Sequence, residues 1–443
     1  MPRLSTTLID VKASLWFAPA TLAGAAIVVA RSLVAVDARV DARLDAALPW
    51  FAGGEPGVAT NVLTVIAGSM ITVATLVFTL TLVALTLAST QFSPRILRMF
   101  MRDRITQTVL GFFVSIFVYC LVVLRTIRSD AGSPFVPSIA VTVGAALGVA
   151  AMGVLVYFMH HIAHSINASN IIATIAAETV EVIDEMYPQG TTAADSSSIE
   201  AELSSADWRT IAAAQTGYIR SIDIDGLADA ATEYGATIRL HRRVGEFIVE
   251  GAAIASVSGD SLKLARDIED CCDVDAQRTM EQDIAFGIRQ LVDIALKALS
   301  SAVNDTTTAL TCVDHLSAIG ARLVTRSVGP IVRRDSEGIR VYVPAQSLED
   351  FLDLAFNQIR QNASGNVAVM IRLLGAVEIV ALAGGTSTPE GAEILASQVR
   401  NVAELAERTV EPAEDRSAVA RRARKIEARL ATSHSMVSSD FKI

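Results

Sequence analysis

Residues 58–88 read VATNVLTVIAGSMITVATLVFTLTLVALTLA, a run of thirty-one positions without one charged side chain. A membrane-spanning helix needs about 20 apolar residues, so this run is more than long enough to cross a bilayer. At about 1.5 Å per residue it would extend for about 46 Å, against a hydrocarbon core of about 30 Å. The helix must therefore tilt, bend near Gly68 or project beyond the lipid.

Three further apolar stretches lie within the first 160 residues, and the four predicted spans are Ser14–Val36, Val58–Ala88, Ile105–Leu124 and Ser138–Met159. The first is too long for the apolar region of a signal peptide, and three spans follow it, so we expect it to be retained. A hydrophobic content of 51% and a mean hydropathy of +0.44 are typical of an integral membrane protein. The expected fold class is a multi-pass α-helical membrane domain (four transmembrane helices) followed by an α+β cytoplasmic region with a small β-rich unit and helices.

Positive charge predicts the orientation in the membrane. The loop between the second and third spans carries four arginines against one acid, Asp103; they are Arg95, Arg98, Arg102 and Arg104. Loops rich in arginine and lysine stay in the cytoplasm, so an even number of spans leaves both termini there. We therefore expect a cell-membrane protein in contact with the lipid bilayer. The net charge of −10 argues against nucleic acid as a partner.

The second span carries a stripe of small and hydroxylated residues within about 120° of one helix face at about 100° per residue. Its members are Thr60, Thr64, Gly68, Thr72, Thr75, Thr79 and Thr86, with Thr90 continuing the pattern. One interpretation is the water-lined wall of a homo-oligomeric pore. The other is helix packing, because small and hydroxylated residues let membrane helices approach and hydrogen-bond.

We expect five segments along the chain. The membrane domain occupies 1–160, and a juxtamembrane helix and polar linker follow at 161–206. A small β-rich unit, expected to be a compact barrel, occupies 207–265, a mainly helical unit 266–383, and charged helices with a tail 384–443. Residues 172–186 follow a heptad-like spacing with the acids off the apolar face. This helix is expected either to pack against neighbouring subunits or to cover its own cytoplasmic domain. The apolar run Val367–Leu382 contains Arg372 and Glu378, which make it a poor span.

Residues 277–309 (QRTMEQDIAFGIRQLVDIALKALSSAVNDTTTA) combine an apolar helix face with ionic side chains. One interpretation is a polar site for an anion, a cation or a partner loop, formed by Arg278, Asp283, Arg289, Asp293, Asn304 and Asp305. The alternative is a solvated ladder of charges plus a helix cap at Asn304 or Asp305.

Metal and cofactor signals are weak. His160 and His164 lie one helical turn apart and form a weak candidate metal pair, but no HExxH motif or carboxylate within one turn accompanies them. The adjacent pair Cys271 and Cys272 and the isolated Cys120 and Cys312 do not form a disulfide framework. We therefore expect no cofactor, no metal and a reducing compartment for the soluble part.

Several passages resemble the bacterial family of predicted membrane proteins called domain of unknown function 2254. They include IAGSMITVATLVFTLTLVALTLASTQFSPRILRMF at 66–100, FMHHIAHSI at 158–166 and the passage from Arg278 to Ala309. The resemblance covers roughly residues 10–380 and implies four membrane helices, a cytoplasmic region and no established activity. It also implies that the six polar residues of 278–305 belong to the family's pattern. One departure is that Ser301 and Thr306 stand where the family more usually has prolines, so this turn is expected to be less rigid.

Three functions are weighed. The favoured one is an oligomeric ion channel or pore with a cytoplasmic regulatory domain. The alternative is a membrane-anchored sensor or scaffold whose cytoplasmic domain binds a ligand or protein partner. Catalysis is not expected, since the chain has no P-loop, GxSxG, HExxH, kinase or dinucleotide fingerprint. The transported species, the number of subunits and the ligand do not follow from the sequence.

Overall fold

The computed structural model of the chain describes residues 16–47, 55–91, 103–128, 135–189, 196–204, 207–258, 261–336 and 338–440. The chain divides into two compact units, and the boundary lies between Asn167 and Ala168. Arg95, Arg98 and Arg102, which carry the orientation argument, lie outside the described residues, as does the start of the first predicted span.

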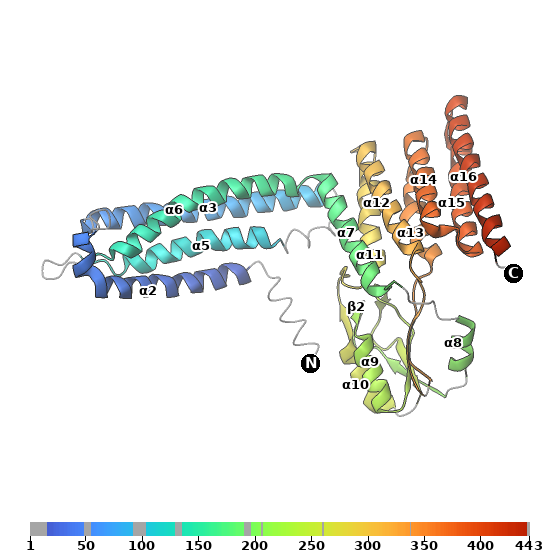
Figure 1. The fold of residues 1–443 in the computed structure, drawn as a ribbon, viewed down its shortest axis with the longest axis horizontal. Coiled ribbons are helices and arrows are strands. Elements are labelled where there is room, and N and C mark those ends of the chain that lie inside the picture. The colour runs from blue at the N-terminus through green and yellow to red at the C-terminus, as the bar shows by residue number, and fades with distance from the viewer. Residues whose placement is uncertain are drawn as a thin grey trace. The chain divides into compact units, whose positions relative to one another are not determined.

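Unit 1 contains four long helices, which Figure 1 draws in blue to green: α2 (Phe17–Ala47), α3 (Pro56–Gln91), α5 (Arg104–Leu124) and α6 (Ser138–Ser165). Helices α3, α5 and α6 cover their predicted spans. Helix α2 covers the first predicted span from Phe17 onward and continues past its expected end at Val36. Helix α5 packs against the other three, and Phe113, Ile116 and Tyr119 from it are buried. Glycines allow the close approaches. A Cβ at Gly111 of α5 would lie 2.9 Å from Pro19 Cα, and a Cβ at Gly144 of α6 would lie 2.9 Å from Leu63 Cδ2.

Five described helices are long and apolar enough to cross a membrane, one more than the four that the sequence predicted. The fifth candidate, Val367–Gly385, lies in unit 2 and comprises α14 (Val367–Val380) and the turn η2 (Ala381–Gly385). The prediction set it aside because of its charges, and both charges have partners in unit 2. Arg372 lies 3.1 Å from Asp314, and Glu378 pairs with two arginines of α16.

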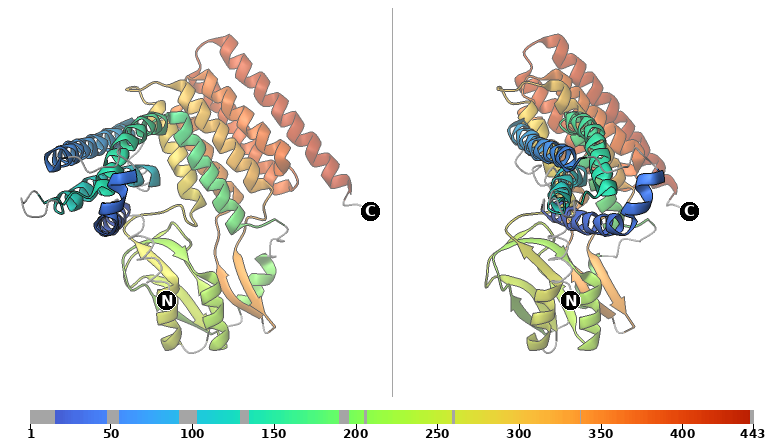
Figure 2. Two further views of the ribbon diagram at one scale, coloured as in Figure 1. Left: turned by 60° about the vertical axis from the view of Figure 1, so that its left-hand side comes forward. Right: turned by 90° about the vertical axis from the view of Figure 1, so that its left-hand side faces the viewer.

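The helical part of unit 2 comprises α7 (Ala168–Met186), α11 (Ile284–Ala298), α12 (Thr306–Val324), α13 (Leu348–Asn362), α14, α15 (Pro389–Thr409) and α16 (Ala413–Asp440). Short polar residues start them, as capping chemistry requires: the side chains of Asp283, Asp305, Ser347, Asn366 and Thr388 each accept a backbone N–H of the first turn. Figure 2 shows these helices side by side from two directions.

Helix α7, which carries the heptad-like pattern, packs against α11 and α12 of its own unit. Its residues Ile172, Ile175, Thr179 and Val182 are buried there. The contact is close, because a Cβ at Gly287 of α11 would lie 2.1 Å from Thr179 Oγ1. The structure therefore agrees with the second interpretation of this helix, in which α7 covers its own domain.

The rest of unit 2 is built on two sheets, one of five strands in the order β1-β5-β3-β8-β7 and one of three in the order β4-β2-β6. The strands are β1 (Trp208–Ala212), β2 (Gly217–Ile222), β3 (Thr237–Leu240), β4 (Phe247–Ile248), β5 (Ala253–Ser258), β6 (Cys272–Asp275), β7 (Ile331–Asp335) and β8 (Gly338–Val343). Helices α9 (Ile224–Glu233) and α10 (Ser261–Cys271) contribute Leu227, Leu264 and Ile268 to the core that covers one face of the larger sheet.

One expectation about this region was wrong. The β-rich part is not a closed barrel confined to 207–265, because β8 pairs in parallel with β3 across about a hundred residues and the larger sheet has free edges at β1 and β7.

The polar linker at 188–206 contains a short helix that was not predicted, α8 (Ser196–Leu203). Ile199 and Leu203 of α8 are buried against Ile339. Two apolar residues four positions apart in a polar segment are too few for a helical pattern to stand out in the sequence.

Candidate functional site

The threonine stripe lies on the face of α3 that points away from the other helices of unit 1. Thr64, Gly68, Thr72, Thr75, Thr79 and Thr86 are exposed and Thr60 is half-buried. The opposite face, with Leu63, Ala67, Met70, Ala74 and Val77, is buried in unit 1. The stripe is therefore free to meet lipid, water or another copy of the chain.

From Thr72 onward, the threonine hydroxyl groups of this stripe form hydrogen bonds within α3 itself. Thr72 donates to the carbonyl of Gly68 at 3.0 Å, Thr75 to that of Ile71 at 2.9 Å, and Thr79 to that of Thr75 at 2.9 Å. Thr86 and Thr90 repeat the pattern four residues back. A hydroxyl that donates its proton keeps lone pairs that accept from water or coordinate a cation.

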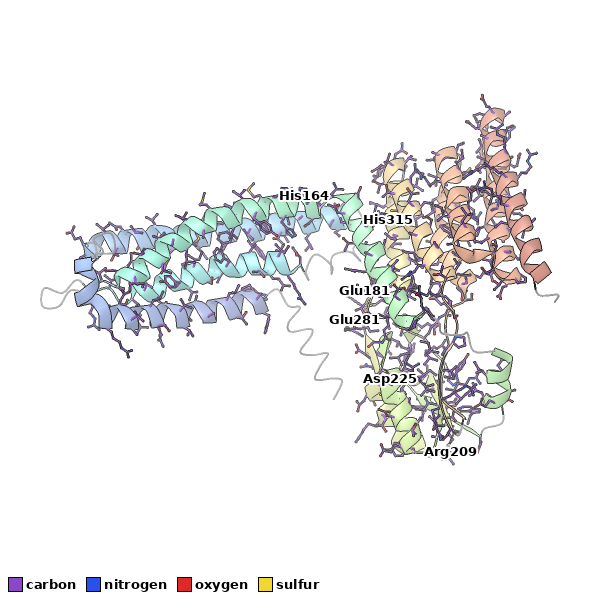
Figure 3. The ribbon with its side chains drawn as sticks, in the orientation of Figure 1. His164, Glu181, Arg209, Asp225, Glu281 and His315 are labelled. Carbon is purple, nitrogen blue, oxygen red and sulfur yellow. The ribbon has the colours of Figure 1, made fainter. Side chains whose placement is uncertain are left out.

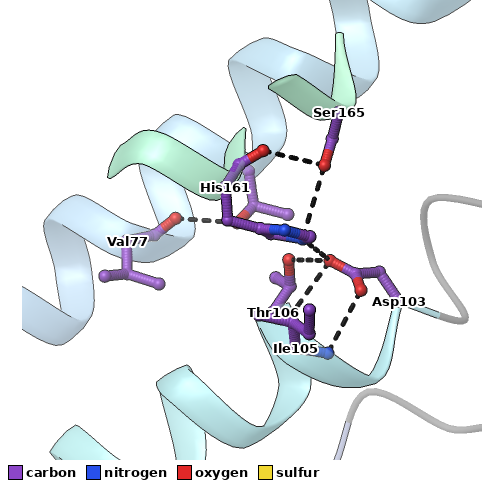
Figure 4. Close-up of polar contacts among 7 residues, drawn as sticks. Val77, Asp103, Ile105, Thr106, His161 and Ser165 are labelled. Carbon is purple, nitrogen blue, oxygen red and sulfur yellow. Dashed lines mark hydrogen bonds and ion pairs between the residues drawn. The ribbon is translucent and has the colours of Figure 1, made fainter. Parts of the chain in front are cut away.

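A polar cluster joins the start of α5 to the end of α6 (Figure 4). Asp103 caps α5 by accepting the N–H groups of Ile105 and Thr106, and its Oδ2 lies 2.9 Å from His161 Nε2. Ser165 Oγ lies 3.3 Å from the same nitrogen. Burial alone would raise the pKa of Asp103, but hydrogen bonds from Thr106 and His161 lower it below its ordinary value. This role of Asp103 could not be predicted from local sequence, because His161 lies 58 positions away.

This cluster is not a nucleophile–base–acid triad. In such a triad the serine and the carboxylate contact different nitrogens of the imidazole. Here Ser165 and Asp103 both approach Nε2 of His161, and the Ser165 hydroxyl donates to the His161 carbonyl. This geometry fits a structural role, in which hydrogen bonds hold the start of α5 against the end of α6.

The candidate metal pair, His160 and His164, is exposed at the end of α6, where Figure 3 labels His164. Their ring centroids lie 4.1 Å apart, and His164 Nδ1 is 3.0 Å from the His160 carbonyl oxygen. In the part of the chain that the structure describes, no group of three or more His, Cys, Asp or Glu side chains has metal-binding geometry.

A second polar link in unit 1 was missed by the sequence analysis. Asp37 of α2 is buried, and its two carboxylate oxygens accept the N–H groups of Ile139 and Ala140, each at 3.0 Å, at the start of α6. The Tyr119 hydroxyl of α5 donates to the Ala140 carbonyl at 2.8 Å. A carboxylate at a helix N-terminus is stabilised by free N–H groups and by the helix dipole. Asp37 therefore joins α2 to α6.

The six residues of the predicted polar site do not converge on one place. Arg278 and Asp283 do meet, with Nε to Oδ2 at 2.7 Å and Nη2 to Oδ1 at 2.8 Å. Asp283 is buried and also caps α11 through the Phe286 N–H, while Arg278 lies over the Phe286 ring. Gly245, with φ +85°, packs against this pair, since a Cβ there would lie 2.4 Å from Asp283 Oδ2.

The other four residues lie elsewhere along α11 and beyond it. Arg289 donates to Gln358 of α13 at 2.6 Å, and Asp293 lies one turn further along α11. Asn304, with φ +49°, and Asp305 occupy the exposed turn after α11, where Asp305 is the N-cap of α12. Because α11 is about 22 Å long, this turn and the Arg278–Asp283 pair are at opposite ends of it. The predicted cap at Asn304 or Asp305 is confirmed for Asp305.

The cysteines of unit 2 are neutral thiols at pH 7. All four cysteines of the chain are free. Burial raises the pKa of Cys271 to about 11 and that of Cys272 to about 12, and it also raises the pKa of Cys312. Because the thiolate is the reactive form of cysteine, burial keeps this adjacent pair in its less reactive, protonated form.

An ionic contact fixes α7 to α12 and gives unit 2 an acid-sensitive element. Asp184 accepts from Arg322 Nε at 2.7 Å and from Arg326 Nη2 at 2.6 Å. The hydrogen bond from Arg322 is the main cause that lowers the pKa of Asp184 to about 2.

We expect stability from this contact to be complete above the ordinary aspartate pKa of about 4 and to be lost as the pH falls toward 2. The measurement is the unfolding midpoint of the detergent-solubilised protein between pH 5 and pH 2, for the wild type and for Asp184→Asn. The wild type should lose more stability than the variant across this window. Parallel curves would show that the contact does not contribute.

The chain was compared with known protein families and with individual proteins. The family described as "Predicted membrane protein (DUF2254)" matches residues 12–378. The chain belongs to this family. Its relatives include an uncharacterized protein of Mycobacterium bovis and two uncharacterized proteins of Mycobacterium tuberculosis, each 34% identical over 380 residues, which cover 83% of this chain and 71% of the relative. No solved structure matches the chain. Family membership thus establishes a predicted membrane protein, and the structure agrees with a multi-pass membrane domain followed by an α+β region. The family description assigns no activity.

Proposed function

We propose that this family member forms an oligomeric ion-conducting pore in the cell membrane, with unit 2 as a cytoplasmic regulatory domain. The observation that carries the proposal is the outward-facing threonine stripe of α3 in a helix without charged residues. Several copies of α3 around one axis would line a path with hydroxyl oxygens, each able to accept from water or to contact a cation. The expected partner is therefore a second copy of the chain.

Ion flux should depend on the threonines of the stripe and not on similar threonines of other helices. Replacing Thr72 or Thr79 by leucine removes an oxygen from the proposed path and narrows it, so ion flux through reconstituted liposomes should fall at least severalfold. Thr142→Leu is the matched control, since Thr142 is also exposed and also donates to a carbonyl four residues back, but lies on α6. Equal flux through all three variants and the wild type would refute the pore.

For topology, we propose that α2, α3, α5 and α6 cross the membrane and that α14 does not. Arg372 and Glu378 of α14 are paired with α12 and α16, and α16 carries many charges. Moving α14 into lipid would either break these ion pairs or place the paired charges in the bilayer as well. Four crossings place both termini in the cytoplasm.

Reporters fused after residue 345 and after residue 443 test this arrangement, because they lie on either side of α14. Both should report the cytoplasm, with a fusion after residue 132 reporting the outside as the control. Opposite signals from the reporters at 345 and 443 would make α14 a fifth span.

The alternative is a membrane-anchored sensor or scaffold. Its support is that the outward face of α3 also exposes Val65, Phe78, Leu82 and Val83, while its hydroxyls are already hydrogen-bonded. Such a face is also stable against lipid. This function is favoured if purified protein is monomeric in nanodiscs and passes no ions.

A further inference from the structure

One face of the five-stranded sheet is packed on α9 and α10, and the opposite face carries a row of side chains across all five strands. The register pairs Thr210 with Ser256, Ser256 with Arg239, Arg239 with Tyr342, and Tyr342 with Val332. Side chains in register on neighbouring strands stand on the same face of a sheet. Arg239 thus lies near the middle of the face opposite the core.

Helix α8 covers only part of this face and leaves a cavity of about 250 Å³ beside it. Both apolar and polar residues line the cavity; they are Ile199, Glu200, Leu203, Ser204, Arg239, Pro330 and Tyr342. At about 30 Å³ per water molecule, this volume holds roughly eight waters, which suits a small ligand.

The charge of Arg239 has no carboxylate partner within 4 Å among the described residues, where neighbouring arginines do. Arg333 pairs with Asp225, Arg334 with Glu202 and Arg340 with Asp335. The Arg239 guanidinium lies over the Tyr342 ring, with Cζ 5.9 Å from the ring centroid. A cation–π contact of this kind favours this position of the guanidinium and leaves its N–H groups available to an anion.

We propose that this cavity binds a small organic anion, with its carboxylate or phosphate on Arg239 and its apolar body against Ile199, Leu203 and Pro330. The guanidinium fork matches the geometry of either oxyanion. Glu200 lines the same cavity and carries the opposite charge, so it limits the affinity of the cavity for an anion. The site is independent of the proposed pore, and its failure would leave the pore untouched.

Trp208 provides a built-in reporter. It packs in the small cluster with Ile199 and Tyr342, and its Nε1 donates to the Leu203 carbonyl at 2.9 Å. Replacing the other two tryptophans, Trp16 and Trp50, by phenylalanine leaves Trp208 as the only source of tryptophan fluorescence. The full-length protein in detergent is then titrated with benzoate, phenyl phosphate, inorganic phosphate and the neutral benzamide.

We expect benzoate and phenyl phosphate to change the Trp208 emission saturably, and benzamide and inorganic phosphate to bind at least tenfold more weakly. The two organic anions separate the carboxylate and phosphate sources. Arg239→Gln should weaken organic-anion binding at least tenfold, while Glu200→Gln should strengthen it. Arg209→Gln is the matched control, because Arg209 is exposed on β1 outside the cavity (Figure 3) and its loss should change nothing.

Two results would overturn the proposal. One is binding of benzamide as tight as that of benzoate. The other is an unchanged affinity in Arg239→Gln or, if that variant does not fold, in Glu200→Gln. Because Glu200 is exposed, its variant keeps the test decisive even if Arg239→Gln does not fold.

Discussion

Asp283→Ala should destabilise unit 2 by about 3–5 kcal/mol, the range for removing one partner of a buried ion pair. Asp283 is 4% exposed, holds Arg278 through two hydrogen bonds and caps α11 through the Phe286 N–H. Alanine leaves the Arg278 guanidinium without its carboxylate and the first turn of α11 without its cap. Pulse proteolysis in urea, with cleavage of unit 2 followed on a gel, measures the free energy of unfolding.

Asp305→Ala is the matched control, because Asp305 caps α12 in the same way but is exposed. It should cost about 1 kcal/mol, the usual worth of an N-cap. Asp283→Asn keeps an oxygen for the cap and removes the ionic partner, so it should fall between wild type and Asp283→Ala. Equal losses for Asp283→Ala and Asp305→Ala would mean that the ion pair with Arg278 adds nothing.

Gly111→Leu should loosen or separate α2 from α5 in unit 1. A Cβ at position 111 would meet the Cα of Pro19 at 2.9 Å and its N at 3.1 Å, as well as the Cδ1 of Leu22 at 2.8 Å. A side chain can rotate away, but the backbone of Pro19 cannot, so the whole helix α2 must move. Overpacking of this kind costs about 1–3 kcal/mol, and backbone contact places the variant at the upper end.

The measurement is the temperature at which the detergent-solubilised protein loses its monodisperse peak on size exclusion. Gly153→Leu on α6 is the control, because nothing lies within 4 Å of a Cβ there. The Gly111 variant should melt several degrees below both wild type and the control. If the two variants melt together, α2 and α5 are not held by this contact.

Apolar length and capping chemistry made much of the fold predictable. Span boundaries came from runs without charge, and the cap at Asp305 from a polar residue before a helical pattern. Features that depend on contacts between residues distant in sequence could not be predicted. Strand β8 belongs beside β3, about a hundred positions earlier, and no local pattern records that pairing.

The candidate sites divide in the same way. The threonine stripe is a property of one helix and could be read from its spacing. Asp37 and Asp103 looked like ordinary loop acids, because the groups that they bind on α6 lie 102 and 58 positions later. Arg289 seemed to belong to a ladder along its own helix, yet it donates to Gln358, 69 positions further along.

The ionic contacts of α14 also bear on how the chain is made. Glu378 binds Arg422 and Arg429, which leave the ribosome 44 and 51 residues later. Synthesis proceeds at about 5–20 residues per second, so α14 emerges a few seconds before the α16 residues that pair with it. Arg372, near its middle, imposes about 2.5–3.5 kcal/mol against lateral release into lipid during that interval. Under the proposed four-span topology, the charges that later hold α14 in its bundle would first disfavour the entry of the nascent segment into the bilayer.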